Sequence, residues 1–410
     1  MRAYYALLLL LWLGLSHIPA FGQKSWEQIN APDDGLVFSL FVNSQDIVFA
    51  GTGGGIFRSS DMGDSWSNTT CKSGWAHSIF DFAEDSKGRL YASAASGVFI
   101  SKDNGASWSM VKDDYMARQV ETDEKDNIYI TASSQSNEYH VSKSSDAGKS
   151  WIDITPGGSN ISLLALCVVN SNLIVLSIGD EILYTTDKGT TWEQGGEVDG
   201  NLYFNSIVSV SDKIIGNARH DNISIGIYES PDGRQWHVIN AFPETISFNW
   251  LKADKYHDKL YAFDRNMGIY KSGDKGYTWN GLFDGFPAKT TVYDIAFSKS
   301  GRLIASASNQ RLYRLSDGAG ITEGREIYQK TSVTIYPNPS DGNFNIKSSC
   351  MIDNIGVYDL SGRKLTNFQY SGTYPNSIAA SVKDILPGLY YLKFYANGNT
   401  FFKSIIVTSD

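Results

Sequence analysis

A short segment that occurs six times constrains the fold of this chain more than any other feature. Residues 59–66 read SSDMGDSW, and the same order of hydroxyl residue, aspartate, glycine and tryptophan returns at 101–108, 144–151, 185–192 and 272–279. A copy shortened by one residue occupies 230–236, and a seventh copy without its tryptophan occupies 315–318. The aspartates of these boxes are Asp61, Asp103, Asp146, Asp187, Asp232, Asp274 and Asp317, at intervals of 41 to 45 residues. A regular interval of this length indicates a repeat architecture, in which each repeat is one supersecondary unit.

Each position of the box has a structural purpose. The aspartate is expected to cap its own turn by accepting hydrogen bonds from backbone N–H groups about two residues further on. The glycine supplies a positive φ that other residues reach only at a cost. The tryptophan opens the next strand with a large apolar face that fits between neighbouring sheets. We therefore expect the box aspartates to stabilise turns rather than to bind ligands.

The residues between the boxes predict the rest of the repeat. Residues 46–51 and 55–59 precede the first box, and 88–93 and 97–101 precede the second, as short apolar runs bounded by Gly, Asp, Asn or Ser. Such runs are typical of strands joined by tight turns. With the strand opened by the tryptophan, each repeat holds four strands, which is one blade of a β-propeller.

The N-terminal strand predicts how the propeller closes. Trp26 lies 35 residues before Asp61 with no box in front of it, whereas the seventh box lacks its tryptophan. We therefore expect residues 25–29 to complete the last blade. The predicted fold is all-β, with a seven-bladed propeller over residues 23–322.

Composition and the N-terminus bear on the compartment. Residues 1–22 have the features of a secretory signal peptide: Arg2, an apolar run at 6–15 and a small-x-small site at 20–22. No later segment is apolar enough to span a bilayer. The formal net charge of −9 argues against nucleic acid or an anionic membrane as the main partner. We expect a monomer.

The period changes near the C-terminus. Residues 323–332 are polar and predict a linker. Residues 333–410 alternate short apolar runs with turn residues, which predicts a small β-sandwich.

Two family resemblances follow from these segments. The box resembles the Asp-box (BNR) repeat of sialidases, xyloglucanases, sortilin-type receptors and photosystem II assembly-factor-like proteins, where it is a hairpin on the side away from any catalytic centre. Residues 333–410 look like the C-terminal sorting domain of the Bacteroidetes type IX secretion system. The matching positions include Pro337, Asn338, Pro339, Gly362, Gly388 and Lys403. This resemblance implies export to the periplasm and then across the outer membrane, with the secretion machinery as partner. It also implies cleavage in the linker and a product that is released or fixed to surface lipopolysaccharide.

Candidate ligand residues lie on the loops that join one blade to the next and on the hairpin between the second and third strands. Aromatic faces beside arginine, histidine and carboxylate suit a sugar, because aromatic rings stack on apolar ring faces and arginine binds carboxylates. The candidates are Trp75, His77, Tyr115, Arg118, Tyr203, Arg219, Trp250, Asp264 and Arg265, with Phe204 and Phe248 beside them. The alternative for each aromatic is packing between blades.

Two function classes remain. The favoured one is a secreted or surface-displayed, non-catalytic module that binds a glycan or a protein. The alternative is a glycoside hydrolase that uses two facing carboxylates. Of the hydrolases, a xyloglucanase-like enzyme fits better than a sialidase, because Arg118, Arg219 and Arg265 lack the Arg-Ile-Pro segment and the Tyr–Glu pair that accompany them in sialidases. No catalytic pair stands out among Asp33, Asp34 and Asp264, and no motif predicts a metal or a cofactor.

Overall fold

The computed structural model describes most of the chain in separate ranges. These are residues 25–32, 35–69, 78–114, 116–134, 138–157, 163–179, 181–195, 203–220, 223–241, 248–264, 268–282, 285–286, 290–315, 333–338, 340–348, 354–359, 363–371, 378–383, 385–396 and 399–408. Within these ranges the regular structure is β-strand throughout, which confirms the predicted all-β class. Among the same residues no helix is long and apolar enough to cross a membrane. The predicted signal peptide and linker lie outside the described residues.

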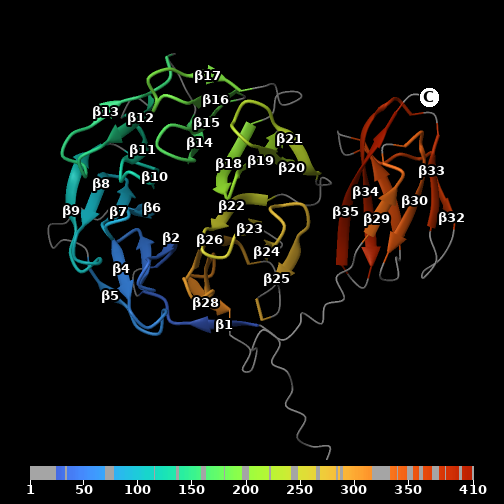
Figure 1. Cartoon of the computed structure of the whole chain (residues 1–410). Coiled ribbons are helices and arrows are strands. Elements are labelled where there is room, and N and C mark those ends of the chain that lie inside the picture. The colour runs from blue at the N-terminus through green and yellow to red at the C-terminus, as the bar shows by residue number, and fades with distance from the viewer. Residues whose placement is uncertain are drawn as a thin grey trace, which may run out of the picture.

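Seven antiparallel four-stranded sheets are arranged in a ring over the described residues between 25 and 315 (Figure 1). Blade 1 contains β2 (Val37–Val42), β3 (Val48–Thr52), β4 (Ile56–Ser59) and β5 (Ser67–Asn68). Blade 2 contains β6 (Ile79–Glu84), β7 (Leu90–Ala94), β8 (Gly97–Ser101) and β9 (Ser109–Asp113). Blade 3 contains β10 (Gln119–Thr122), β11 (Ile128–Ser133), β12 (Tyr139–Ser144) and β13 (Ile152–Asp153). Blade 4 contains β14 (Leu163–Val168), β15 (Ile174–Ile178), β16 (Glu181–Thr185) and β17 (Glu193–Gln194).

The remaining blades follow the same order. Blade 5 contains β18 (Tyr203–Val210), β19 (Lys213–His220), β20 (Ile223–Ser230) and β21 (His237–Ala241). Blade 6 contains β22 (Phe248–Asp254), β23 (Lys259–Asp264), β24 (Gly268–Ser272) and β25 (Asn280–Leu282). Blade 7 contains β26 (Val292–Phe297), β27 (Leu303–Ala307), β28 (Arg311–Leu315) and β1 (Trp26–Ile29). The first strand of each blade is the inner strand, and these seven strands surround the axis of the ring (Figure 1).

The ring closes through the N-terminal strand, as the sequence predicts. Strand β1 pairs antiparallel with β28, and Trp26 lies opposite Leu315. The Trp26 indole Nε1 donates a hydrogen bond to the Leu282 carbonyl of blade 6 at 2.9 Å. Its ring also meets Phe286 edge-on at 5.5 Å. Trp26 therefore occupies the place of the tryptophan that the seventh box lacks.

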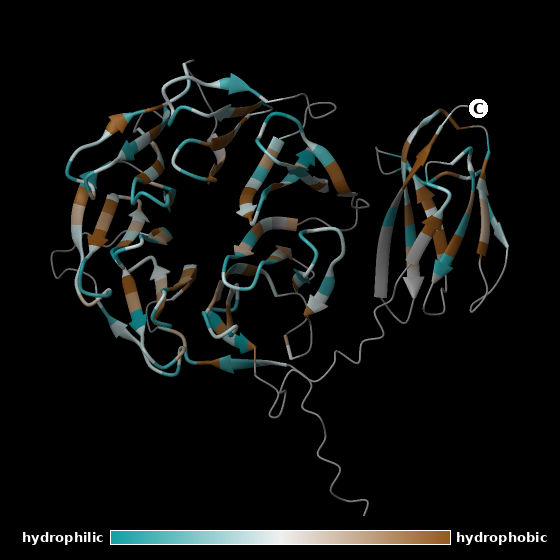
Figure 2. Ribbon diagram, in the orientation of Figure 1, coloured by the Kyte–Doolittle hydropathy of each residue, from teal (hydrophilic) through white to brown (hydrophobic). Residues whose placement is uncertain are grey.

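The propeller core lies between neighbouring blades. The box residue Trp108 of blade 2 is buried against Phe49 of blade 1, with the two rings 6.2 Å apart and nearly perpendicular. Figure 2 shows apolar stretches along the strands and polar residues in many of the turns between them. Because each blade buries both faces against its neighbours, no blade has a complete core of its own.

The box aspartate accepts more hydrogen bonds, and from a different backbone N–H group, than the sequence predicts. In blade 2, Asp103 Oδ1 accepts hydrogen bonds from the Ser107 N–H at 2.9 Å and from Ser101 Oγ at 2.8 Å. Ser107 Oγ donates to the other oxygen of the carboxylate at 2.5 Å, and Ser101 Oγ accepts from the Gly105 N–H. The backbone N–H bonded by the aspartate is thus four residues on, not two, and the preceding hydroxyl residue shares the capping. The same four-residue spacing recurs at Asp61, Asp146, Asp187 and Asp274, whereas the shortened box bonds Asp232 to the Arg234 N–H two residues on. Asp317 lies outside the described residues.

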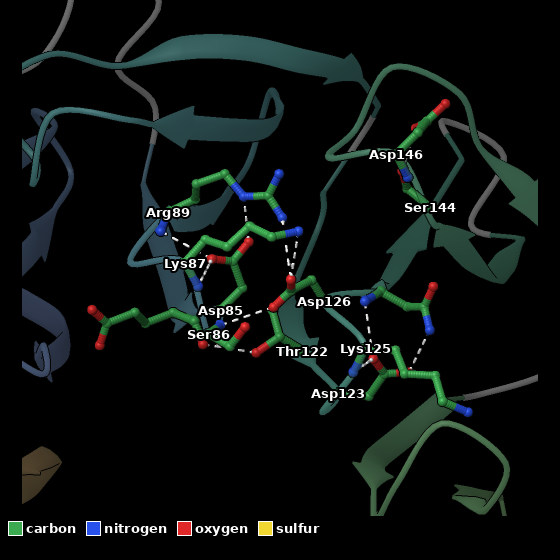
Figure 3. A network of polar contacts seen from close by, with 12 residues as sticks. Asp85, Ser86, Lys87, Arg89, Thr122, Asp123, Lys125, Asp126, Ser144 and Asp146 are labelled. Atoms are coloured by element: carbon green, nitrogen blue, oxygen red, sulfur yellow. Dashed lines mark hydrogen bonds and ion pairs between the residues drawn. The ribbon is translucent and has the colours of Figure 1, made fainter.

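Polar contacts link neighbouring hairpins on the side of the ring that carries the boxes, here called the box side (Figure 3). Lys87 of blade 2 forms an ion pair with Asp126 of blade 3 at 2.8 Å, and the Ser86 N–H donates to the same carboxylate at 2.9 Å. The hydrogen bond from Lys87 and burial oppose one another, and the net effect lowers the pKa of Asp126 to about 2. The hairpins between first and second strands are therefore bonded to one another as well as to their own blades.

The C-terminal region forms a small two-sheet sandwich. One sheet has the order β29 (Val333–Tyr336), β30 (Asn343–Ser348), β33 (Ile378–Val382) and β32 (Phe368–Ser371). The other has the order β31 (Asn354–Tyr358), β34 (Gly388–Ala396) and β35 (Asn399–Val407). Phe344 and Ile346 from the first sheet and Val357, Leu392 and Phe394 from the second share one buried cluster.

Candidate ligand-binding site

The inner strands define the side of the ring opposite the boxes. In an antiparallel meander the hairpin that follows the first strand and the box turn that follows the third strand share one side. The beginnings of the inner strands therefore lie on the other side, here called the strand-start side. Those predicted ligand residues that the structure describes belong to this side by topology.

Four of the predicted residues can be placed with their side chains. Tyr203 and Arg219 are cross-strand partners in blade 5, on β18 and β19. Trp250 is the third residue of β22, the inner strand of blade 6; it is 41% exposed and stacks on Phe263 with ring centroids 6.1 Å apart. Arg118, just before β10, holds its guanidinium 5.9 Å from the ring centre of Phe80.

The other predictions divide into three groups. Asp264 is the last residue of β23 and pairs with Phe248 across the sheet. Trp75, His77, Tyr115 and Arg265 lie outside the described residues. The expectation for Phe204 and Phe248 was wrong, because both are about 1% exposed and pack against the box residues Trp236 and Trp279. They belong to the core between blades.

A register shift explains which aromatic side chains reach the surface. Six inner strands slip by one residue near their beginning, whereas β10 pairs in register throughout. The residue left without a cross-strand partner is Phe38 in blade 1, Phe80 in blade 2 and Tyr293 in blade 7. A bulge of this kind turns a side chain away from the face that the strand alternation would give it.

Phe38, Phe80 and Tyr293 form what we call the aromatic arc, which sequence reasoning missed. Each is the second residue of its inner strand, in three consecutive blades. Phe38 is 38% exposed, and the other two are half-buried. The signal in the sequence is a triplet of buried aliphatic residue, aromatic residue and Ser or Asp, found at 37–39, 79–81 and 292–294.

Three further residues, here called the axial carboxylates, project from the inner strands toward the next blade. Asp294 of blade 7 accepts a hydrogen bond from the Leu40 N–H of blade 1 at 2.7 Å. Asp81 of blade 2 accepts from the Val120 N–H of blade 3 at 3.2 Å. Glu121 of blade 3 accepts from the Val168 N–H of blade 4 at 2.8 Å. An inner strand is a sheet edge with unpaired N–H groups, and these carboxylates satisfy some of them.

A lysine joins this group from blade 6. Lys252 Nζ lies 2.6 Å from Asp294 Oδ1 and donates to the Leu40 carbonyl at 3.2 Å, so that it bridges blades 6, 7 and 1. Burial raises the pKa of Asp81 to about 6, although the charge of Lys252 opposes the shift. Burial likewise raises the pKa of Glu121 to about 7, against the charge of Lys255. Carboxyl groups with pKa values near neutrality are candidates for acid–base chemistry.

The described residues offer little for other kinds of site. Among them, no group of three or more His, Cys, Asp and Glu side chains could hold a metal ion. Cys167 is buried on β14, where burial raises the pKa of its thiol.

Comparison with known proteins supports the two-part organisation. Residues 334–408 match the family described as secretion system C-terminal sorting domain. Of the residues that carry this resemblance, Pro337, Asn338, Gly388 and Lys403 are described, and Pro339 and Gly362 are not. No curated protein matches the chain in sequence.

Solved structures resemble the ring at low sequence identity. YCF48 bound to a D1 peptide has a TM-score of 0.56 at 15% identity, covering 73% of this chain and 99% of that one. Virginiamycin B lyase from Staphylococcus aureus has a TM-score of 0.57 at 10% identity, covering 72% and 99%. The WD40 β-propeller domain of Doa1 has a TM-score of 0.53 at 12% identity, covering 72% and 98%. At these identities the likeness concerns the fold alone. The chain is a β-propeller that carries a secretion system C-terminal sorting domain.

Proposed function

We propose that the protein is exported through the type IX secretion system and acts at the cell surface or outside the cell as a non-catalytic module that binds glycans. The proposed organisation is a signal peptide at 1–22, a propeller at 23–322, a linker at 323–332 and a sorting domain at 333–410. The secretion machinery would cleave the linker and leave the propeller free or fixed to lipopolysaccharide. The match of residues 334–408 to the sorting-domain family supports this route.

One observation carries the binding function. Trp250 is 41% exposed near the beginning of an inner strand, and its ring is held parallel to the buried Phe263 beneath it, at an interplanar angle of 19°. An exposed aromatic face that is fixed by a second ring presents a rigid platform to the apolar face of a sugar. Arg118, on the same side of the ring, is paired with no carboxylate among the described residues, so its N–H groups suit sugar hydroxyls.

A glycan array with the purified protein tests this function. Trp250→Ala should weaken binding to any hit about fivefold or more, since a stacked aromatic contact contributes roughly 1 kcal/mol. Tyr256→Ala is the matched control, because Tyr256 is 45% exposed on the same blade but follows the other end of β22. Equal loss in both variants, or no loss in either, would place the site elsewhere.

The axial carboxylates favour one second candidate, a glycoside hydrolase. Asp81 and Glu121, with pKa values of about 6 and 7, could supply an acid and a base. Their hydrogen bonds to the next blade support a structural role instead. Release of reducing sugar from a bound glycan, lost in Asp81→Asn and Glu121→Gln, would establish the enzyme and refute the non-catalytic module.

A further inference from the structure

We infer that the aromatic arc of Tyr293, Phe38 and Phe80 is the platform on which an uncharged saccharide chain lies across three blades. This inference rests on the proposed function, because it names the residues and the ligand class of the same side of the ring. Neither the arc nor the class of ligand follows from the likeness of the fold.

Two of the predicted ligand residues, Trp250 and Arg118, lie on the blades at either end of the arc. Trp250 lies on blade 6, Tyr293 on blade 7, Phe38 on blade 1 and Phe80 on blade 2. Arg118, at the beginning of blade 3, lies over Phe80. Five consecutive blades therefore contribute a ring or a guanidinium near the beginning of the inner strand. A linear chain that follows the rim meets these groups in order.

The backbone makes the arc rigid and open. Bulges place Phe38, Phe80 and Tyr293 outside the regular strand pairing, so the sheet sets the backbone position from which each ring projects. Beside Phe38 runs the glycine-rich hairpin at 51–55, and a Cβ built on Gly53 would lie 3.9 Å from the Phe38 ring. Because glycine has no side chain, the hairpin leaves that ring accessible.

Hydrogen bonding at the inner edges favours a saccharide over a peptide. A peptide that adds a strand to a sheet needs free N–H groups along the edge. Asp294 already binds the Leu40 N–H, and Asp81 binds the Val120 N–H. In blade 6 the Leu251 N–H donates to Ser206 Oγ at 3.1 Å. One N–H on each of these three inner edges is therefore already bonded, which disfavours strand addition there, whereas ring faces remain for stacking.

The charges near the arc favour an uncharged chain. Asp81 follows Phe80 directly, and Asp294 follows Tyr293. Two cations balance these carboxylates, since Lys252 is paired with Asp294 and the Arg118 guanidinium lies over Phe80. The described residues of the arc therefore offer no net positive charge that would attract a uronate polymer. Sugar hydroxyls can instead donate to the acceptor positions that the carboxylates retain.

The test is titration calorimetry of the purified protein with cellohexaose, mannohexaose, laminarihexaose, chitohexaose and hexagalacturonate. At least one uncharged hexasaccharide should bind, and hexagalacturonate should bind at least tenfold more weakly.

Variants of the arc test which residues hold the uncharged hexasaccharide. Phe38→Ala, Phe80→Ala and Tyr293→Ala should each weaken its binding at least fivefold, about 1 kcal/mol. Phe38→Tyr and Phe80→Tyr keep the ring and should bind as the wild type does. Tyr256→Ala is the control for an exposed aromatic residue outside the arc.

The outcomes separate this inference from the function on which it rests. If Trp250→Ala weakens binding while the three arc variants bind normally and keep the wild-type melting temperature, the arc is refuted and the glycan-binding function stands. Preferential binding of hexagalacturonate would refute the uncharged ligand class. If none of the saccharides binds and a peptide array gives ligands instead, both the arc and the proposed function are refuted.

Discussion

Asn338 Oδ1 accepts the backbone N–H of Ile406 at 2.9 Å, which joins the beginning of the sorting domain to its last strand. Next to this bond Ser340 forms a parallel bridge with Val407. Two segments that the sequence resemblance matched separately are thus one structural unit. The surface that the secretion machinery is proposed to meet depends on both ends of the domain.

Asn338→Ala should therefore reduce export. The loss of one partly exposed hydrogen bond costs about 1 kcal/mol, which loosens the terminal strand without unfolding the propeller. The measurement is the amount of protein on intact cells and in the medium, relative to the total. Gln369→Ala, an exposed position on β32 of the same domain, is the control. Equal export of both variants would contradict a role for this bond.

The box glycine has two separate reasons to be glycine. Gly105 has a φ of 78°, and a Cβ built on it would overlap the ring of Phe49 in the preceding blade. Gly179 has a φ of 57° and nothing within 4 Å of such a Cβ. Gly179→Ala thus measures backbone strain alone, about 1 kcal/mol. Gly105→Ala should lower the free energy of unfolding by about 1–3 kcal/mol more than Gly179→Ala does, because the added methyl group overpacks the core. The measurement is the urea midpoint of each variant. Equal losses would show that the turn, not the contact between blades, requires glycine.

Ring closure predicts a large effect at the N-terminus. Trp26 is 4% exposed, and replacement of a buried tryptophan by alanine costs about 3–5 kcal/mol. Trp26→Ala should therefore lower the thermal midpoint markedly. Glu27→Ala, whose carboxylate is half exposed in its ion pair with Arg314, should have little effect. An unchanged midpoint in Trp26→Ala would contradict closure by this strand.

Two of the axial carboxylates, Asp81 and Glu121, predict that stability falls as the pH rises from about 4 to 7. Asp81 and Glu121 have ordinary pKa values of 3.8 and 4.5, and burial raises them to about 6 and 7 in the folded protein. Between these values the folded state binds protons that the unfolded state has lost. Each unit by which the pH rises therefore lowers the free energy of unfolding. Asp81→Asn combined with Glu121→Gln should flatten the dependence of the urea midpoint on pH over this interval. A wild-type urea midpoint that does not fall between pH 4.5 and 7 would contradict raised pKa values at these half-buried carboxyl groups.

Asp81 and Glu121 also show which features of the fold could not be predicted from the sequence. The strand order and the ring closure could be predicted, because the interval between boxes and the isolated Trp26 depend only on the repeat. The partial burial of Asp81 and Glu121 could not be predicted, since it depends on how closely seven inner strands approach one axis. Phe204 was misplaced for a related reason. The register slips after Phe204, at Asn205, and a slip of one residue changes which side chains face the core.

A crystal structure of the protein with its tightest-binding hexasaccharide tests the central claim most directly. The account predicts sugar rings stacked on Phe38 and Phe80, extending toward Tyr293 and Trp250, on the strand-start side of the ring. Sugar bound on the box side, against the turns at 59–66 or 101–108, or on the sorting domain, would contradict it.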